Sequence, residues 1–362
     1  MSTPDDNVEP ARDAALEAAI VAAPAALEPT RVYCDWLCER GDVRGELMAI
    51  QLQRELCRDA REERRLAVEQ RELIERHYLD LFGRVASSGQ LRKVRLVWRR
   101  GLVRAAELWL ETGDGFDEAE RMLAAVQQLP SAIVLERVLL SVADTFGAFS
   151  GAIGRVGLSP CVRELVFDSN RYREGEVCWE LMQPGIQHVE RLDLCCERVT
   201  LPDKPRLLQA RSLSLRLGSI SCGELETLGR LEAPELVSLS LAVTEYHGGR
   251  GWLGTLYAPL GREVVPLLRP AGTPALRELE LRRLRRGDEV IEALVGEPWP
   301  ALEQLGLVSC RVTDQGVALL CKHAATLGNI ARLDLRRNAI TAGGRLALRR
   351  AFGERVLLGG NP

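Results

Sequence analysis

Apolar residues recur in one fixed frame along most of the chain, and the clearest copy lies at residues 329–341. There Ile330, Leu333, Leu335 and Ile340 are spaced around Asn338. The Leu-x-Leu step predicts a short strand, and asparagine is suited to turn the chain out of it because its side chain hydrogen-bonds nearby backbone. Further in-phase copies, which together define the leucine frame, are Val162/Leu165/Phe167/Asn170, Val189/Leu192/Leu194/Val199, Ala210/Leu213/Leu215/Ile220, Leu236/Leu239/Leu241, Leu276/Leu279/Leu281 and Leu302/Leu305/Leu307/Cys310/Val312.

A frame repeated in this way is typical of leucine-rich repeats. With a degenerate copy at Leu135/Val138/Leu140, the copies begin at residues 135, 162, 189, 210, 236, 276, 302 and 330. Intervals near 27 residues leave room for a strand, a turn and a helix, and such copies resemble ribonuclease-inhibitor-like leucine-rich repeats. We therefore expect an α/β fold, a leucine-rich-repeat solenoid with a parallel concave sheet. Residues 355–362 repeat the strand-and-asparagine pattern and predict a terminal cap.

Upstream of the repeats the apolar residues have helical spacing. Residues 11 to about 83 predict successive helices, with Asp13 suited to cap the first and Gly41 suited to end the second. Near residues 91–103 the period changes to two, which predicts a hairpin turning at Gly101. The predicted organisation is a disordered N-terminus at 1–10, an all-helical domain at 11–90 and a repeat domain at 91–362, with an insert at about 247–273.

The stretch at residues 33–51 carries a signature within the helical part. It reads Asp35, Trp36, Leu37, Glu39, Arg40, Gly41, Asp42, Arg44, Gly45 and Glu46, with Cys34 and Cys38 as departures from the pattern. It resembles the bacterial repeat-companion domain, whose signature is Asp-Trp-Leu-x-Glu-Arg-Gly-Asp-x-Arg-Gly-Glu. With matching segments at 16–20 and 99–103 the resemblance covers about a quarter of the chain. It implies a bacterial helical domain that precedes repeats, and it implies no activity.

Composition indicates the compartment in which the protein resides. The hydrophobic fraction of 46% and the charged fraction of 27% are ordinary for a soluble protein, and no apolar run approaches the roughly 18 residues of a membrane span. Residues 1–10 carry Asp5, Asp6 and Glu9 instead of the basic and apolar regions of a secretory signal. We expect a cytoplasmic protein that is a monomer outside its complex and has no membrane partner.

Charge argues against a nucleic-acid partner. The net charge of −3 divides into −6 for residues 1–90, with 18 acids and 12 arginines, and +3 for the remainder, with 33 acids and 36 bases. Neither part has the strongly basic character that is typical of nucleic-acid-binding domains.

Candidate catalytic and metal-binding chemistry is sparse. The ten cysteines lack a Cys-x-x-Cys pair and the four histidines are far apart, so we expect reduced thiols and no metal. The acidic cluster Asp35, Glu39, Asp42 and Glu46 surrounds a helix–glycine–helix junction and alternates with arginines, which favours capping and ion pairing over catalysis or partner contact. No phosphate-loop or Gly-x-Ser-x-Gly pattern is present. We expect no enzyme activity and no cofactor.

The residues beside the strand leucines predict the exposed, concave face of the sheet. Serines at its centre leave room for a partner, and the insert emerges beside them, although these serines and the insert's aromatic residues have a structural alternative as tolerated surface residues and core residues. We predict a protein-protein interaction scaffold or adaptor whose partner-binding residues are Ser212, Ser214, Arg216, Ser238, Ser240, Trp252, Tyr257, Glu278, Glu280 and Arg282. The alternative is a GTPase regulator, because Ran GTPase-activating proteins look like solenoids of this type and the chain is rich in arginine.

Overall fold

The computed structural model describes residues 11–87, 90–111, 113–142, 147–169, 176–218, 220, 222–243, 272–296 and 299–361. The N-terminus at 1–10 and positions 247–271 of the predicted insert lie outside these residues. The chain divides into two compact units. The first unit comprises residues 1–110, 117–139 and 158–162, and the second comprises 111–116, 140–157 and 163–362. The first unit thus extends beyond residue 90, where the sequence pattern placed a boundary.

The first unit contains consecutive helices followed by an antiparallel hairpin. Asp13 caps the first helix by accepting hydrogen bonds from the backbone N–H groups of Ala15 and Leu16, both at 3.0 Å, as predicted. The hairpin turns at Arg100 and Gly101, which both have positive φ. The elements are α1 (Ala14–Ala22), α2 (Glu28–Cys38), α3 (Val43–Leu56), α4 (Ala60–Arg76), α5 (Tyr78–Ser87), β1 (Val94–Arg99), β2 (Leu102–Leu110) and α6 (Phe116–Gln127).

The signature stretch forms the junction between α2 and α3. Gly41 has a φ of +66°, which lets the chain leave α2 without strain. Asp42 caps α3 by accepting from the Arg44 N–H at 3.0 Å, and it also forms an ion pair with the buried Arg44 guanidinium at 2.6 Å. A Cβ on Gly45 would lie 2.7 Å from the backbone nitrogen of Cys38, so the two helices require glycine there. The predicted capping and pairing roles of Asp42 are confirmed.

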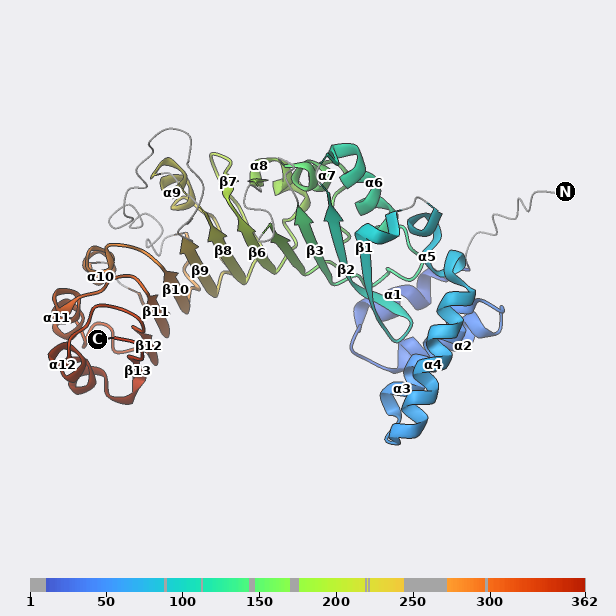
Figure 1. The fold of residues 1–362 in the computed structure, drawn as a ribbon, viewed down its shortest axis with the longest axis horizontal. Coiled ribbons are helices and arrows are strands. Elements are labelled where there is room, and N and C mark those ends of the chain that lie inside the picture. The colour runs from blue at the N-terminus through green and yellow to red at the C-terminus, as the bar shows by residue number, and fades with distance from the viewer. Residues whose placement is uncertain are drawn as a thin grey trace. The chain divides into compact units, whose positions relative to one another are not determined.

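The second unit is built on a large parallel sheet, and helices lie between several of its successive strands (Figure 1). Its strands follow one another in chain order, and each is parallel to the next. They are β4 (Glu164–Asp168), β6 (Arg191–Cys196), β8 (Ser212–Leu217), β9 (Ser238–Val243), β10 (Glu278–Arg282), β11 (Gln304–Val308), β12 (Arg332–Asp334) and β13 (Val356–Leu357). The predicted α/β class is confirmed.

The remaining elements complete the two units. β3 (Arg137–Val142) spans the division between them. In the second unit, β5 (Glu176–Cys178) and β7 (Arg198–Thr200) pair in a small parallel sheet of their own. Figure 1 shows α10, α11 and α12 next to one another, beside the C-terminal strands. The helices of this unit are α7 (Ala148–Val156), α8 (Trp179–Met182), α9 (Cys222–Leu228), α10 (Gly287–Val295), α11 (Asp314–Lys322) and α12 (Ala342–Phe352).

A ladder of leucines forms the core beneath the parallel strands. The first leucine of each Leu-x-Leu step pairs in register with the first leucine of the neighbouring strand, and all members are at most 3% exposed. Strand side chains alternate between faces, so this register puts one apolar row inside and leaves the intervening residues outside. The ladder that the leucine frame predicted is confirmed at Leu165, Leu192, Leu213, Leu239, Leu279, Leu305 and Leu333.

Asn338 turns the chain after β12 by bonding buried backbone on both sides. Its Oδ1 accepts from the N–H groups of Cys310 and Val312 at 2.9 and 3.1 Å, and its Nδ2 donates to the carbonyls of Leu307 and Leu335 at 2.6 and 2.9 Å. The predicted role of this asparagine is therefore confirmed. Asn361 repeats the arrangement at the chain's end, where its Nδ2 donates to Leu335 and Leu358 carbonyls at 3.0 and 2.8 Å.

Aspartate–threonine bonds connect the starts of successive helices. Asp288 accepts from the Thr313 hydroxyl at 2.5 Å and from the Gly316 N–H at 3.1 Å. Asp314 accepts from the Thr341 hydroxyl at 2.6 Å in the same way. Thr313 and Thr341 also cap α11 and α12, so each threonine both starts its own helix and holds the preceding one.

Replacing Leu305 with alanine should lower the free energy of unfolding by about 2–5 kcal/mol, because it leaves a cavity in the buried ladder. Urea-induced unfolding measures this change. Leu346→Ala is the matched control, since Leu346 is 52% exposed on α12. A control effect as large as that of Leu305→Ala would contradict the assignment of Leu305 to the core.

Replacing Asn338 with alanine should lower the free energy of unfolding by at least about 1–3 kcal/mol, because buried N–H and C=O groups lose their partners. The same change at Asn361 should cost less, since fewer buried groups depend on it. Equal stability of wild type and Asn338→Ala in urea titrations would show that water replaces the asparagine without loss.

Candidate functional site

The side chains between and beside the ladder leucines form three rows that cross the parallel strands on the face opposite the leucine ladder. The rows follow directly from the strand register. The first row is Glu164, Arg191, Ser212, Ser238, Glu278, Gln304 and Arg332, and the second is Val166, Asp193, Ser214, Ser240, Glu280, Gly306 and Asp334. The third is Asp168, Cys195, Arg216, Ala242, Arg282 and Val308.

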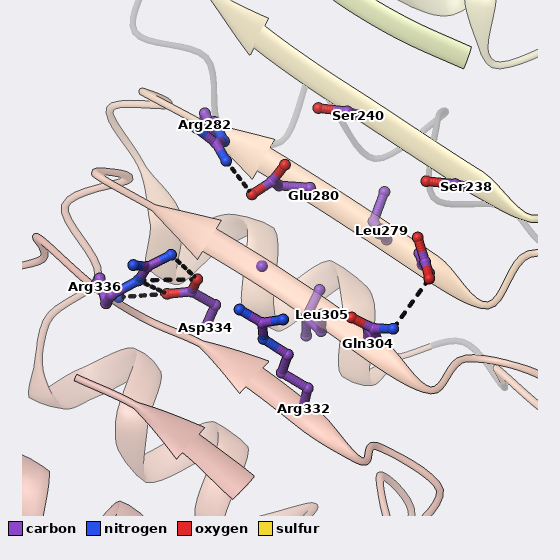
Figure 2. A pocket seen from close by; sticks show the side chains of 12 residues that line it. Ser238, Ser240, Leu279, Glu280, Arg282, Gln304, Leu305, Arg332, Asp334 and Arg336 are labelled. Carbon is purple, nitrogen blue, oxygen red and sulfur yellow. Dashed lines mark hydrogen bonds and ion pairs between the residues drawn. The ribbon is translucent and has the colours of Figure 1, made fainter. Parts of the chain in front are cut away.

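A polar hollow lies on this face over β9, β10, β11 and β12. Its volume is about 250 Å³. Figure 2 shows its charged and polar side chains converging from these neighbouring strands. The lining residues are Ser238, Ser240, Glu278, Leu279, Glu280, Arg282, Gln304, Leu305, Gly306, Arg332, Asp334 and Arg336.

Gly306 keeps the centre of the hollow open. It lies in the second row between Glu280 on β10 and Asp334 on β12, where the other strands carry side chains. A Cβ at this position would lie 3.2 Å from Cγ of Glu280. A larger side chain here would therefore project into the space between the flanking carboxylates.

Carboxylate–arginine pairs fix the charged groups of the hollow. Glu280 forms an ion pair with Arg282 at 2.7 Å. Asp334 accepts from both Nη2 and Nε of Arg336, at 2.6 and 2.9 Å. These two arginines are about half exposed, so they are held in place while still facing solvent. Within these pairs, four of the hollow's six charged side chains neutralise one another.

The Asp334 carboxylate stays ionised despite its burial. Burial alone would raise its pKa, but the hydrogen bonds from Arg336 and the positive charges of Arg336 and Arg332 outweigh burial and hold the pKa below its usual value. Asp334 therefore supplies a permanent negative charge that orients Arg336.

Two ionisable side chains of the hollow form no ion pair within the described residues. Glu278 accepts a hydrogen bond from the neutral Gln304 amide at 3.0 Å. The Arg332 guanidinium makes no hydrogen bond or ion pair with any residue of the described ranges, although its charge acts on Asp334. Figure 2 shows the Arg332 side chain extending from β12 toward β11. These two groups are the ones available to a binding partner.

The structure brings together half of the predicted partner-binding residues. Ser238, Ser240, Glu278, Glu280 and Arg282 line the hollow. The other residues with described positions, Ser212, Ser214 and Arg216, lie on the adjacent strand β8, where Arg216 pairs with Asp193 at 3.1 Å. Trp252 and Tyr257 lie outside the described residues.

The sequence-based set omitted the C-terminal half of the hollow, which consists of Gln304, Gly306, Arg332, Asp334 and Arg336. One signal was available, since Gly306 is the glycine among the middle positions of the Leu-x-Leu steps. A glycine between charged residues of flanking strands marks a place where the face is hollowed.

The described residues contain no cluster of three or more His, Cys, Asp or Glu side chains placed to hold a metal ion. Nine cysteines with described side chains are free thiols. Burial raises the pKa of both Cys196 and Cys310 to about 12, so these thiols stay protonated at neutral pH. Within the same ranges, no helix is both long and apolar enough to cross a membrane.

Comparisons with known proteins bear on the fold. No family model and no curated protein matches the chain. The chain is similar to a crystal structure of a protein from Bacteroides fragilis, a structural genomics target, with a TM-score of 0.53 and 14% sequence identity. The similarity covers 81% of this chain and 84% of that one. It supports the mixed α/β architecture and carries no functional information.

Asp334→Asn should lower the free energy of unfolding by about 1–3 kcal/mol at pH 7, because hydrogen bonds to a charged group are lost. The folded-state pKa of Asp334 is depressed, so this contribution is present above the unfolded-state pKa near 3.9 and is lost as the pH falls through the folded-state pKa. Urea unfolding of both proteins between pH 7 and pH 2 should show the difference shrinking below about pH 4.

Glu303→Gln is the control for this experiment, because Glu303 pairs with Arg277 at the exposed surface. It should change stability by less than about 1 kcal/mol at any pH. A difference between wild type and Asp334→Asn that stays constant down to pH 2 would contradict the ionised pair.

Proposed function

We propose that this protein is a non-enzymatic interaction protein that binds a partner polypeptide across the exposed face of its parallel sheet, centred on the hollow at Gly306. One observation carries the proposal, namely a polar hollow of about 250 Å³ in which ion pairs hold four of the charged side chains, Glu280, Arg282, Asp334 and Arg336, in place. Side chains that are already ordered lose little conformational entropy on binding, and this favours affinity.

The repeat architecture of the second unit is part of the same proposal. We infer a leucine-rich-repeat solenoid in which the exposed rows form the concave face. The in-register leucine ladder supports it because it recurs with the period of the leucine frame, and the Asn338 hydrogen bonds support it because they join one segment to the preceding one. A repeat-companion domain in the first unit is supported by the glycine, aspartate and arginine contacts of the α2–α3 junction.

The cellular setting is inferred from the sequence and the free thiols. A bacterial, cytoplasmic protein that is monomeric outside its complex is consistent with nine free cysteines, because reducing compartments keep thiols reduced. Arg282 and Arg336 are each held by a carboxylate two residues before them on the chain. That arrangement favours a binding surface over the GTPase-regulator alternative, in which an arginine must reach into a nucleotide site.

The test is recovery of a partner by the full chain from extracts of its own cells, followed by affinity measurement with the purified partner. Gly306→Gln fills the hollow without adding charge and should weaken partner affinity at least about tenfold. Ser240→Gln, on the adjacent strand, should act in the same direction.

Gly343→Gln is the matched control, because Gly343 is exposed at the start of α12 and a Cβ there meets no atom closer than 3.6 Å. This variant should bind as wild type does. Thermal unfolding of all variants separates lost binding from lost folding. Unchanged affinity in both hollow variants would contradict the proposed site.

A further inference from the structure

The carboxylates in the second row of the hollow are neutralised by ion pairs, whereas the first row carries one unpaired negative and one unpaired positive side chain. Glu280 is neutralised by Arg282 and Asp334 by Arg336. In the first row, the Glu278 carboxylate has only the neutral Gln304 amide as its partner, and the Arg332 guanidinium has no hydrogen-bonding or ion-pairing partner in the ranges described. One negative and one positive group therefore remain available on the same row.

These two groups have a fixed order and spacing. Glu278, Gln304 and Arg332 lie in register on β10, β11 and β12. Adjacent strands are separated by about 4.8 Å, so the backbones that carry the two charges are about 10 Å apart. Gln304 bonds to Glu278 and so separates the two charges with a neutral group.

Small side chains on one flank allow a polypeptide to approach this pair of charges. Ser212 and Ser214 on β8 are in register with Ser238 and Ser240 on β9, and the latter two line the hollow. Gly306 has no side chain, so the centre of the hollow is also free of bulky groups. A polypeptide lying across the strands would pass over short side chains before it reaches Glu278 and Arg332.

We infer that the hollow selects a polypeptide segment with a basic side chain placed at Glu278 and an acidic side chain placed at Arg332. This inference rests on the proposed binding function and adds the chemistry and the orientation of the partner. Opposite charges across an interface set specificity and speed association, whereas like charges disfavour the reversed orientation. The charges of Glu278 and Arg332 thus fix the direction in which the segment lies.

The test uses a displayed library of random short peptides, selected on the immobilised full chain. Wild type, Arg332→Glu and Glu278→Lys serve as separate baits. Peptides that wild type enriches should carry both an acidic and a basic residue. The Arg332→Glu pool should lose the acidic residue, and the Glu278→Lys pool should lose the basic one.

Affinity measurements then test one consensus peptide from the wild-type pool. It should bind Arg332→Glu at least about tenfold more weakly than wild type, and replacing its acidic residue with lysine should restore binding to that variant. Binding to wild type should weaken as salt rises, since exposed charges are screened. Gly343→Gln should bind the peptide as wild type does.

Two failures of this experiment have different meanings. If Gly306→Gln abolishes binding of the wild-type pool, but the charge variants select the same residues as wild type, the charge inference is overturned and the binding function stands. If wild type yields no pool that Gly306→Gln weakens, both the proposed binding function and the inference are overturned.

Discussion

The strand register is the constraint on which the exposed face depends. Because side chains alternate along a strand, a shift of one residue would move every ladder leucine to the surface and every exposed residue into the core. Burial of leucines such as Leu279 and Leu305 therefore fixes which residues stand beside one another across the strands. Glu280, Gly306 and Asp334 become neighbours only for this reason, although they are far apart in the sequence.

The hollow combines an apolar floor with charged walls. Leu279 and Leu305 lie beneath it as members of the core ladder, and the ion pairs lie on β10 and at the end of β12. Arg282 and Arg336 are oriented by carboxylates two residues before them on the chain. Rigid strands thus hold the charged groups at set separations, which suits them to recognise charges on a partner rather than to move during chemistry.

The sequence predicted those features that depend on local spacing. A period of two and a recurrent interval are enough to identify strands and their register, and aspartate or threonine before a helical run identifies caps such as Asp13 and Thr313. The position of the hollow was not predicted, because it depends on what lies across the sheet. The predicted set covered β8, β9, the insert and β10, whereas the hollow extends to Asp334 and Arg336, whose pairing is visible only once both side chains are placed.

The aspartate–threonine bonds between helix starts also make successive segments interchangeable. Asp288 contacts Thr313 as Asp314 contacts Thr341, and a Cβ at Gly316 or Gly344 would lie within 2.3 Å of the corresponding aspartate oxygen. Duplication or removal of one complete segment would leave each aspartate facing a threonine and a glycine. Duplication of residues 314–340 would therefore add a strand beyond the hollow and keep the hollow's residues together, whereas removal of the same segment would delete Arg332, Asp334 and Arg336 from it.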